Sequence, residues 1–173
     1  MDLYDRFSGN DSWHTRKLLE YAAQLSDEQL DRELSTVVEI LPWRETTKTL
    51  RQLLENIIYT KEVWAAALAG GEMPKKRTAS QRSPKGMLTR LEKTDAELHR
   101  IFQDVGRRGA WDDTFVDALC EPPETFTFGG MFAHVIMFNA YRRLVAIDAM
   151  RRLGVKVEGF GCPSEYLTSL GGA

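Results

Sequence analysis

The sequence predicts an all-α protein with the architecture of a four-helix bundle. Three observations carry this prediction: four long segments have apolar residues at helical spacing, capping residues or glycines stand at their ends, and no convincing strand alternation separates them. At 173 residues, the chain is long enough to bury one sizeable core. We therefore expect a single bundle domain over residues 1–173.

The first helix is expected over residues 10–25, with Asn10 or Asp11 as its N-cap. Ser26 opens a capping-box sequence, which predicts a short helical turn directly afterwards. Residues 34–44 are expected to be irregular, because a proline near the end of this segment breaks any helix.

The second helix is expected over residues 46–69, and the Gly70–Gly71 pair after it suits a C-terminal cap. The third is expected over residues 84–106, because Ser83–Pro84 supplies an N-cap followed by proline at the first helical position. The long crossover between them, residues 70–83, exceeds what antiparallel neighbours need. Its length permits the two helices to be parallel without requiring it.

The fourth helix is expected over residues 127–153, and Gly154 ends it. The connection before it, residues 110–126, has room for one extended piece, which cannot form a sheet alone. The tail over residues 155–173 is rich in glycine, and three of its larger side chains are expected to pack against the bundle: Phe160, Tyr166 and Leu167.

Composition and charge exclude several classes of protein. A net charge of -2 argues against a sequence-independent nucleic-acid binder, which would show a basic surplus. No apolar run reaches the roughly 20 residues that span a bilayer, and the first residues lack the order of a signal peptide. Cys120 and Cys162 match no metal or redox spacing and are expected to be reduced thiols. We expect a cytoplasmic protein with neither nucleic acid nor membrane as partner.

The fourth helix carries apolar residues on two faces. One face has Arg142 at its centre, with His134 and Tyr141 on its shoulder, and the opposite face is apolar as well. A helix that is apolar nearly all round is covered on both sides, which favours a homodimer with this helix at the interface. Cover by the C-terminal tail is the competing explanation.

Arg142 allows two interpretations, because a guanidinium on an apolar stripe needs a carboxylate, a ligand or water. In the first, Arg142 bonds a carboxylate such as Glu20 or Glu62, or extends to solvent. In the second, it binds an anion in a pocket of the bundle.

The second helix has a strip of small or polar residues that includes Asn56 and Thr60. This strip either lines a cavity or allows a close contact between helices. Lys61 interrupts the leucine stripe and is expected to reach solvent.

The histidines form no pair at the spacing that would place two imidazoles on one metal. His99 is expected to be exposed, and His134 to hydrogen-bond across the bundle. A metal site assembled across helices from His14, His134 and a carboxylate stays open as the less favoured alternative to a protein without a cofactor.

The chain resembles the DinB-like superfamily, which includes the DinB and YfiT proteins. Three stretches carry the resemblance: Trp13 with Leu18–Leu19 and Leu25–Leu30; Leu53–Ile57 with Glu62 and Trp64; and Phe128–Val135 with Arg143 and Arg152–Gly154. The resemblance implies a four-helix bundle with up-down-down-up topology. Dimers are common in this superfamily.

The resemblance also implies a place for a functional site. Many members bind a divalent metal through one histidine on the second helix and two on the fourth, and some are thiol-dependent transferases or isomerases that use bacillithiol or mycothiol. These positions carry Asn56, Phe138 and Arg142 here, and His134 matches a frequent histidine that is not a ligand. A family-type metal centre is therefore not expected.

Three functions follow as hypotheses. The favoured one is a metal-free protein that binds a small anionic or thiol-containing molecule in a pocket of the bundle. The pocket residues are Asn56, Thr60, His134, Phe138, Tyr141 and Arg142. The alternatives are a metal-dependent hydrolase or thiol transferase with a displaced metal site, and a non-enzymatic dimeric interaction module. The sequence names no substrate and leaves open whether the protein is an enzyme.

Overall fold

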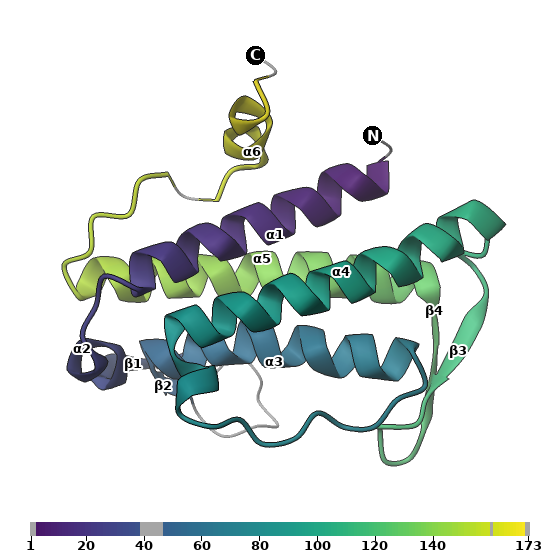
Figure 1. The fold of residues 1–173 in the computed structure, drawn as a ribbon, viewed down its shortest axis with the longest axis horizontal. Helices are drawn as coiled ribbons and strands as arrows, with labels where there is room; N and C mark the ends of the chain where they lie inside the picture. Colours follow the sequence, from purple (N-terminus) through teal and green to yellow (C-terminus); the bar gives the residue numbers. More distant parts are fainter. Residues whose placement is uncertain (1–2, 39–46, 160, 172–173) are drawn as a thin grey trace.

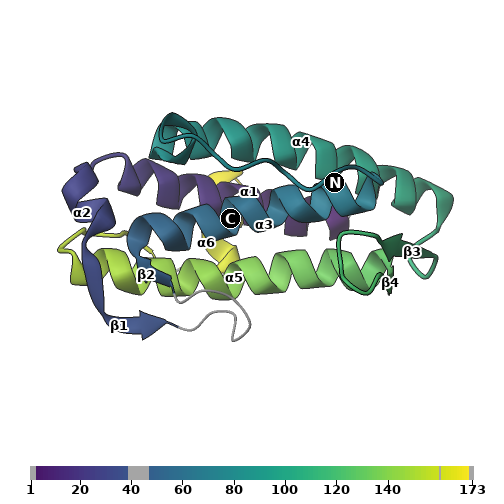
Figure 2. The same cartoon turned by 90° about the horizontal axis from the view of Figure 1, so that it is seen from below.

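A computed structural model describes residues 3–38, 47–159 and 161–171, and it is mostly helical (Figure 1). Among the described residues, the long helices are α1 (Leu3–Ala22), α3 (Leu50–Leu68), α4 (Pro84–Arg108) and α5 (Phe128–Arg152). Helix α1 packs on α4 and α5, and α3 packs on the same two helices. The view in Figure 2 accordingly places α4 and α5 on either side of α3. The all-α class is confirmed.

The core fills the space between these helices with leucine, isoleucine, methionine and alanine side chains. A second, aromatic cluster closes one end of the bundle, where Tyr4 lies among Phe102, Trp111 and Phe132. Burial of Tyr4 explains why α1 begins at Leu3, well before the expected N-caps at Asn10 and Asp11. Within the described residues, no helix combines the length and the apolar composition that crossing a bilayer requires.

The structure corrects the expectation that the chain has no paired strands. Strand β3 (Thr114–Asp117) pairs antiparallel with β4 (Glu124–Thr127), so the one extended piece expected before the last long helix does find a partner. Strand β1 (Glu33–Val38) pairs with β2 (Thr47–Thr49) where an irregular segment was expected. Ladders this short give too little alternation to be seen in a sequence. Residues 39–46 lie outside the described part.

Capping explains where the remaining helices begin. Ser26 forms the predicted capping box and starts α2 (Asp27–Asp31). Thr49 forms a second capping box with Gln52, so α3 begins after the expected start of the second helix. Thr127 and Ser83 cap α5 and α4 through their hydroxyl groups, as the sequence indicates.

The C-terminal tail contains a helix, α6 (Pro163–Ser169), that the sequence analysis did not predict. It packs on the side of α1 away from α3 (Figure 1). Tyr166 is buried as expected, and a side chain at Gly9 would collide with its hydroxyl. Leu167 remains 39% exposed, so its expected packing is incomplete. Phe160 lies outside the described residues.

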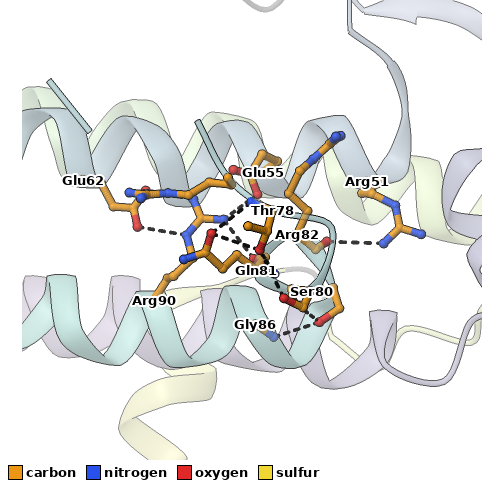
Figure 3. A network of polar contacts seen from close by, with 11 residues as sticks. Arg51, Glu55, Glu62, Thr78, Ser80, Gln81, Arg82, Gly86 and Arg90 are labelled. Atoms are coloured by element: carbon orange, nitrogen blue, oxygen red, sulfur yellow. Dashed lines mark hydrogen bonds and ion pairs between the residues drawn. The ribbon is translucent and has the colours of Figure 1, made fainter. Parts of the chain in front are cut away.

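The connection between α3 and α4 contains the short 3₁₀ helix η1 (Ser80–Arg82) and runs back along the bundle (Figure 1). Arg90 of α4 fastens it by donating to the carbonyl oxygen of Gln81 over 3.0 Å and to Glu62 and Glu55 of α3 (Figure 3). Arg51 donates to the carbonyl oxygen of Arg82 (Figure 3). These bonds hold an otherwise polar loop against two helices.

Candidate functional site

Four of the six predicted pocket residues meet in a gap between α3 and α5. Thr60 of α3 and three residues of α5, His134, Phe138 and Arg142, line this gap together. The space between their side chains is about 150 Å³ in total and is too narrow to hold a water molecule. The structure therefore brings four of the six predicted site residues together, around a gap that is closed in this conformation.

Arg142 is the most buried cation of the gap. Its side chain is 1% exposed, and its guanidinium carbon lies 4.4 Å from the centre of the Phe138 ring. This cation–π contact offsets part of the cost of removing the guanidinium from water. Glu62 binds Arg90 and Arg77, and Glu20 binds Lys17, so both carboxylates suggested for Arg142 engage other cations.

Within the described residues, His134 makes no hydrogen bond across the bundle, although the sequence suggested one. Its ring stacks on Phe138 at 5.3 Å and meets the Trp64 indole edge-on at 5.4 Å. Partial desolvation of its ring and the nearby charge of Arg142 lower its pKa below the ordinary value of 6.5, although the residue as a whole is exposed. The exposed His134 is thus a neutral imidazole at pH 7, available at the rim of the gap.

Asn56 and Tyr141 are the two predicted pocket residues that lie outside the gap. The Asn56 amide donates to the Thr47 hydroxyl over 2.9 Å, which ties α3 to strand β2. The Tyr141 ring packs beside Phe138 at 6.2 Å, yet the side chain is 47% exposed. These two predicted residues do not line the gap itself.

The gap does not suit a divalent metal. Phe138 has no donor atom, the Asn56 amide is held by Thr47, and the Arg142 guanidinium would repel a cation. Among the described residues, no group of three or more histidine, cysteine or acidic side chains stands close enough to hold a metal. His14, named for a displaced site, directs Nε2 to the carbonyl oxygen of Cys162 over 3.1 Å.

A network that the sequence analysis missed crosses the middle of the bundle. It joins one residue from each long helix: Asp11 of α1, Lys61 of α3, Asp95 of α4 and Arg143 of α5. Lys61 donates to Asp11 over 2.8 Å and also to Asp95, and Arg143 donates to Asp11. Lys61 is 3% exposed, so the expectation that it reaches solvent is wrong.

The network holds Asp11 and Lys61 in their charged forms. Burial alone would raise the pKa of Asp11, but the charges and hydrogen bonds of Lys61 and Arg143 lower it below the ordinary value of 3.8. Burial likewise opposes the charge of Lys61, while Asp11 and Asp95 raise its pKa. Two acids and two cations balance, which is why ionised groups can stay in this core.

A second cavity lies between α1, α5 and the tail and has a volume of about 380 Å³. His14 lines it and is 5% exposed. Because a carbonyl oxygen only accepts, Nε2 carries the proton, and Nδ1 stands 3.9 Å from the Glu165 carboxylate. Burial and the charge of Arg143 lower the pKa of His14, although Cys162, Glu165 and Asp11 act in the opposite direction.

Replacing Lys61 by methionine should lower the free energy of unfolding by about 3–5 kcal/mol, because Asp11 and Asp95 lose a buried cation. Lys17→Met is the matched control, since it removes an exposed pair with Glu20 and should cost less than about 0.5 kcal/mol. Urea denaturation measures both variants. Equal losses in the two would contradict the role of the network.

Acidification below about pH 6.5 should destabilise the protein, and His14 should contribute to this loss together with His134. The folded pKa of His14 lies below 6.5, so the unfolded chain binds more protons and the free energy of unfolding falls as the pH falls below 6.5. Asp11 acts only at lower pH, because its folded pKa lies below 3.8. Urea denaturation between about pH 8 and about pH 5 should show a weaker slope in His14→Gln than in wild type. An unchanged slope would mean that His14 does not titrate as described.

Comparison with known proteins agrees with this fold. A family model described as the DinB superfamily matches residues 11–146, which is most of the chain and covers α3 and α4 completely and α1 and α5 in part. Searches of curated proteins and of solved structures gave no significant match. The predicted membership is confirmed. The chain belongs to the DinB superfamily.

Proposed function

We propose that this DinB-superfamily protein works without a metal and binds a small anion between α3 and α5. The observation that carries the proposal is the buried guanidinium of Arg142, which lines the gap between α3 and α5. A fixed positive charge in a site of low dielectric favours carboxylates, phosphates or thiolates over metal ions.

Access to the gap requires a side-chain movement, because the gap is closed in this conformation. We propose that His134 makes this movement, because it is exposed and contacts Phe138 and Trp64 through its ring. Rotation of its ring would uncover Phe138 and the guanidinium behind it. A neutral His134 could then accept a proton from a bound thiol or acid.

We propose the up-down-down-up order for the four long helices and one domain over residues 1–173. The connection that runs back along the bundle between α3 and α4 supports the order (Figure 1). The burial of Tyr166 of α6 against α1 supports a single domain. Two free thiols, Cys120 and Cys162, fit the reducing cytoplasm, which we propose as the location.

A homodimer through α5 is the second part of the proposal. Met137, Tyr141 and Leu144 follow one another at helical spacing and are 72%, 47% and 55% exposed. The tail covers Ile147 on this helix but leaves these three side chains uncovered. A continuous apolar face of this kind is typical of an interface between proteins, and it also suits an interaction module without enzymatic activity.

Binding of small anions can be measured by the thermal stability of untagged protein. Inorganic phosphate and succinate are the probes, and at about 100 times Kd a bound anion should raise the free energy of unfolding by about 2.7 kcal/mol. Arg142→Met should abolish the effect, whereas Arg100→Met, at an exposed arginine of α4, should preserve it. A shift that persists in Arg142→Met, or its absence from wild type, would refute the site. Elemental analysis of the same sample should find no stoichiometric metal.

The dimer can be tested by sedimentation equilibrium. Wild type should be a dimer, and Met137→Glu should be a monomer, because a carboxylate would be buried in the interface. Val116→Glu changes a side chain of β3 that is 59% exposed and should leave the dimer intact. A wild-type monomer at all concentrations would exclude the proposed interface.

A further inference from the structure

The cavity between α1, α5 and the tail lies on a different face of α5 from the Arg142 gap. Its wall on α5 is formed by Ala140, Arg143, Leu144 and Ile147, none of which lines that gap. The volume of about 380 Å³ lies within the range of small-molecule sites. In this conformation the cavity has room for water-sized molecules, whereas the gap has none.

Arg143 brings unused hydrogen-bond donors to this cavity. The Arg143 side chain is buried. All of its hydrogen bonds to described residues are donated by Nη1, which bonds the carboxylate and the carbonyl oxygen of Asp11 and the hydroxyl of Thr15. Nε and Nη2 bond no atom in the described part of the chain. Because a guanidinium offers paired donors in a fixed fork, this free edge matches a carboxylate.

The walls of the cavity are apolar and aromatic. Trp13, Leu18 and Tyr21 form the α1 side, and Leu144 and Ile147 form the α5 side. Lys17 lines it as well, and its ammonium lies 5.9 Å from the centre of the Trp13 ring. An apolar body can therefore lie between the two helices while a charged end reaches Arg143.

The acidic residues of the cavity restrict the charge of the ligand. Glu158 and Glu165 stand on the tail side, where the Gly161 N–H donates to Glu165 over 3.4 Å. A second negative charge on the ligand would be repelled by these carboxylates. The charge of Arg143 is already paired with the Asp11 carboxylate, although Lys61 also neutralises that carboxylate. The balance of charges favours a single negative charge over a phosphate or a dicarboxylate.

We propose that the cavity between α1 and α5 binds a monocarboxylate with an aromatic or aliphatic body. The carboxylate takes hydrogen bonds from Nε and Nη2 of Arg143, and the body packs between the Trp13 and Tyr21 side of α1 and the apolar residues of α5. This site and its ligand class are independent of anion binding at Arg142.

Isothermal titration of the full chain with 3-phenylpropionate tests the proposal, and 3-phenylpropionamide serves as the uncharged analogue. The acid should bind about tenfold or more tightly than the amide, because it makes charge-assisted hydrogen bonds. Arg143→Lys keeps a cation for Asp11 but lacks the fork, and should weaken binding of the acid by about tenfold or more. Arg16→Lys, at an exposed arginine of α1, should bind like wild type.

Nuclear magnetic resonance of wild-type protein locates the site even if Arg143→Lys fails to fold. The acid should shift the indole resonance of Trp13 and leave that of Trp64, beside His134, unchanged. Equal affinity for acid and amide, undiminished binding by folded Arg143→Lys, a shift at Trp64 alone, or no binding of the acid would each overturn the proposal. Phosphate and succinate should not shift Trp13, so failure of this site is distinguishable from failure of the site at Arg142.

Discussion

The ion network around Asp11 is the constraint on which the bundle depends. Asp11 receives Lys61 from α3 and Arg143 from α5, and Lys61 extends the contact to Asp95 of α4. The hydrophobic effect is non-directional, whereas a buried charge must meet its partner at a fixed height along the helix. The network therefore fixes the register of the four helices, and it does so at the cost of desolvating every member. An incomplete network would leave a buried charge unpaired, so its four residues act as one unit.

The same network determines what α5 can offer to a ligand. Consecutive residues of a helix point about 100° apart, so Arg142 and Arg143 face different surroundings although they are neighbours in sequence. Arg142 lies against Phe138 between α3 and α5, and Arg143 lies between α1 and α5 with one nitrogen committed to Asp11. A helix that holds metal ligands in relatives carries two buried cations here. Under the function that we propose, the fold is retained while the charge of the bound species is reversed.

The sequence predicts this arrangement where the signal is local and fails where it is not. Ser26 and Ser83–Pro84 correctly mark the starts of two helices, because a cap depends only on residues within one or two turns. The apolar stripe of the last long helix likewise indicates the buried position of Arg142. The sequence pattern places Lys61 in solvent, because its partners Asp11 and Asp95 are distant in the sequence and become neighbours only in the packed bundle. The sequence does not predict the strand pairs or α6 for a related reason: such short elements are stabilised mainly by tertiary contacts.

The arrangement of donors on Arg143 explains how one buried cation can serve both the fold and a ligand. Asp11 occupies Nη1 alone, and Lys61 supplies a second cation to the same carboxylate, so Asp11 does not need the whole guanidinium. If Lys61 were at the surface, Asp11 would need both edges of Arg143 and the cavity would present no donor. The buried position of Lys61 is thus the feature that frees the outer edge of Arg143. Because Glu158 and Glu165 line the same cavity, the ligand that we propose brings one negative charge and an otherwise apolar surface.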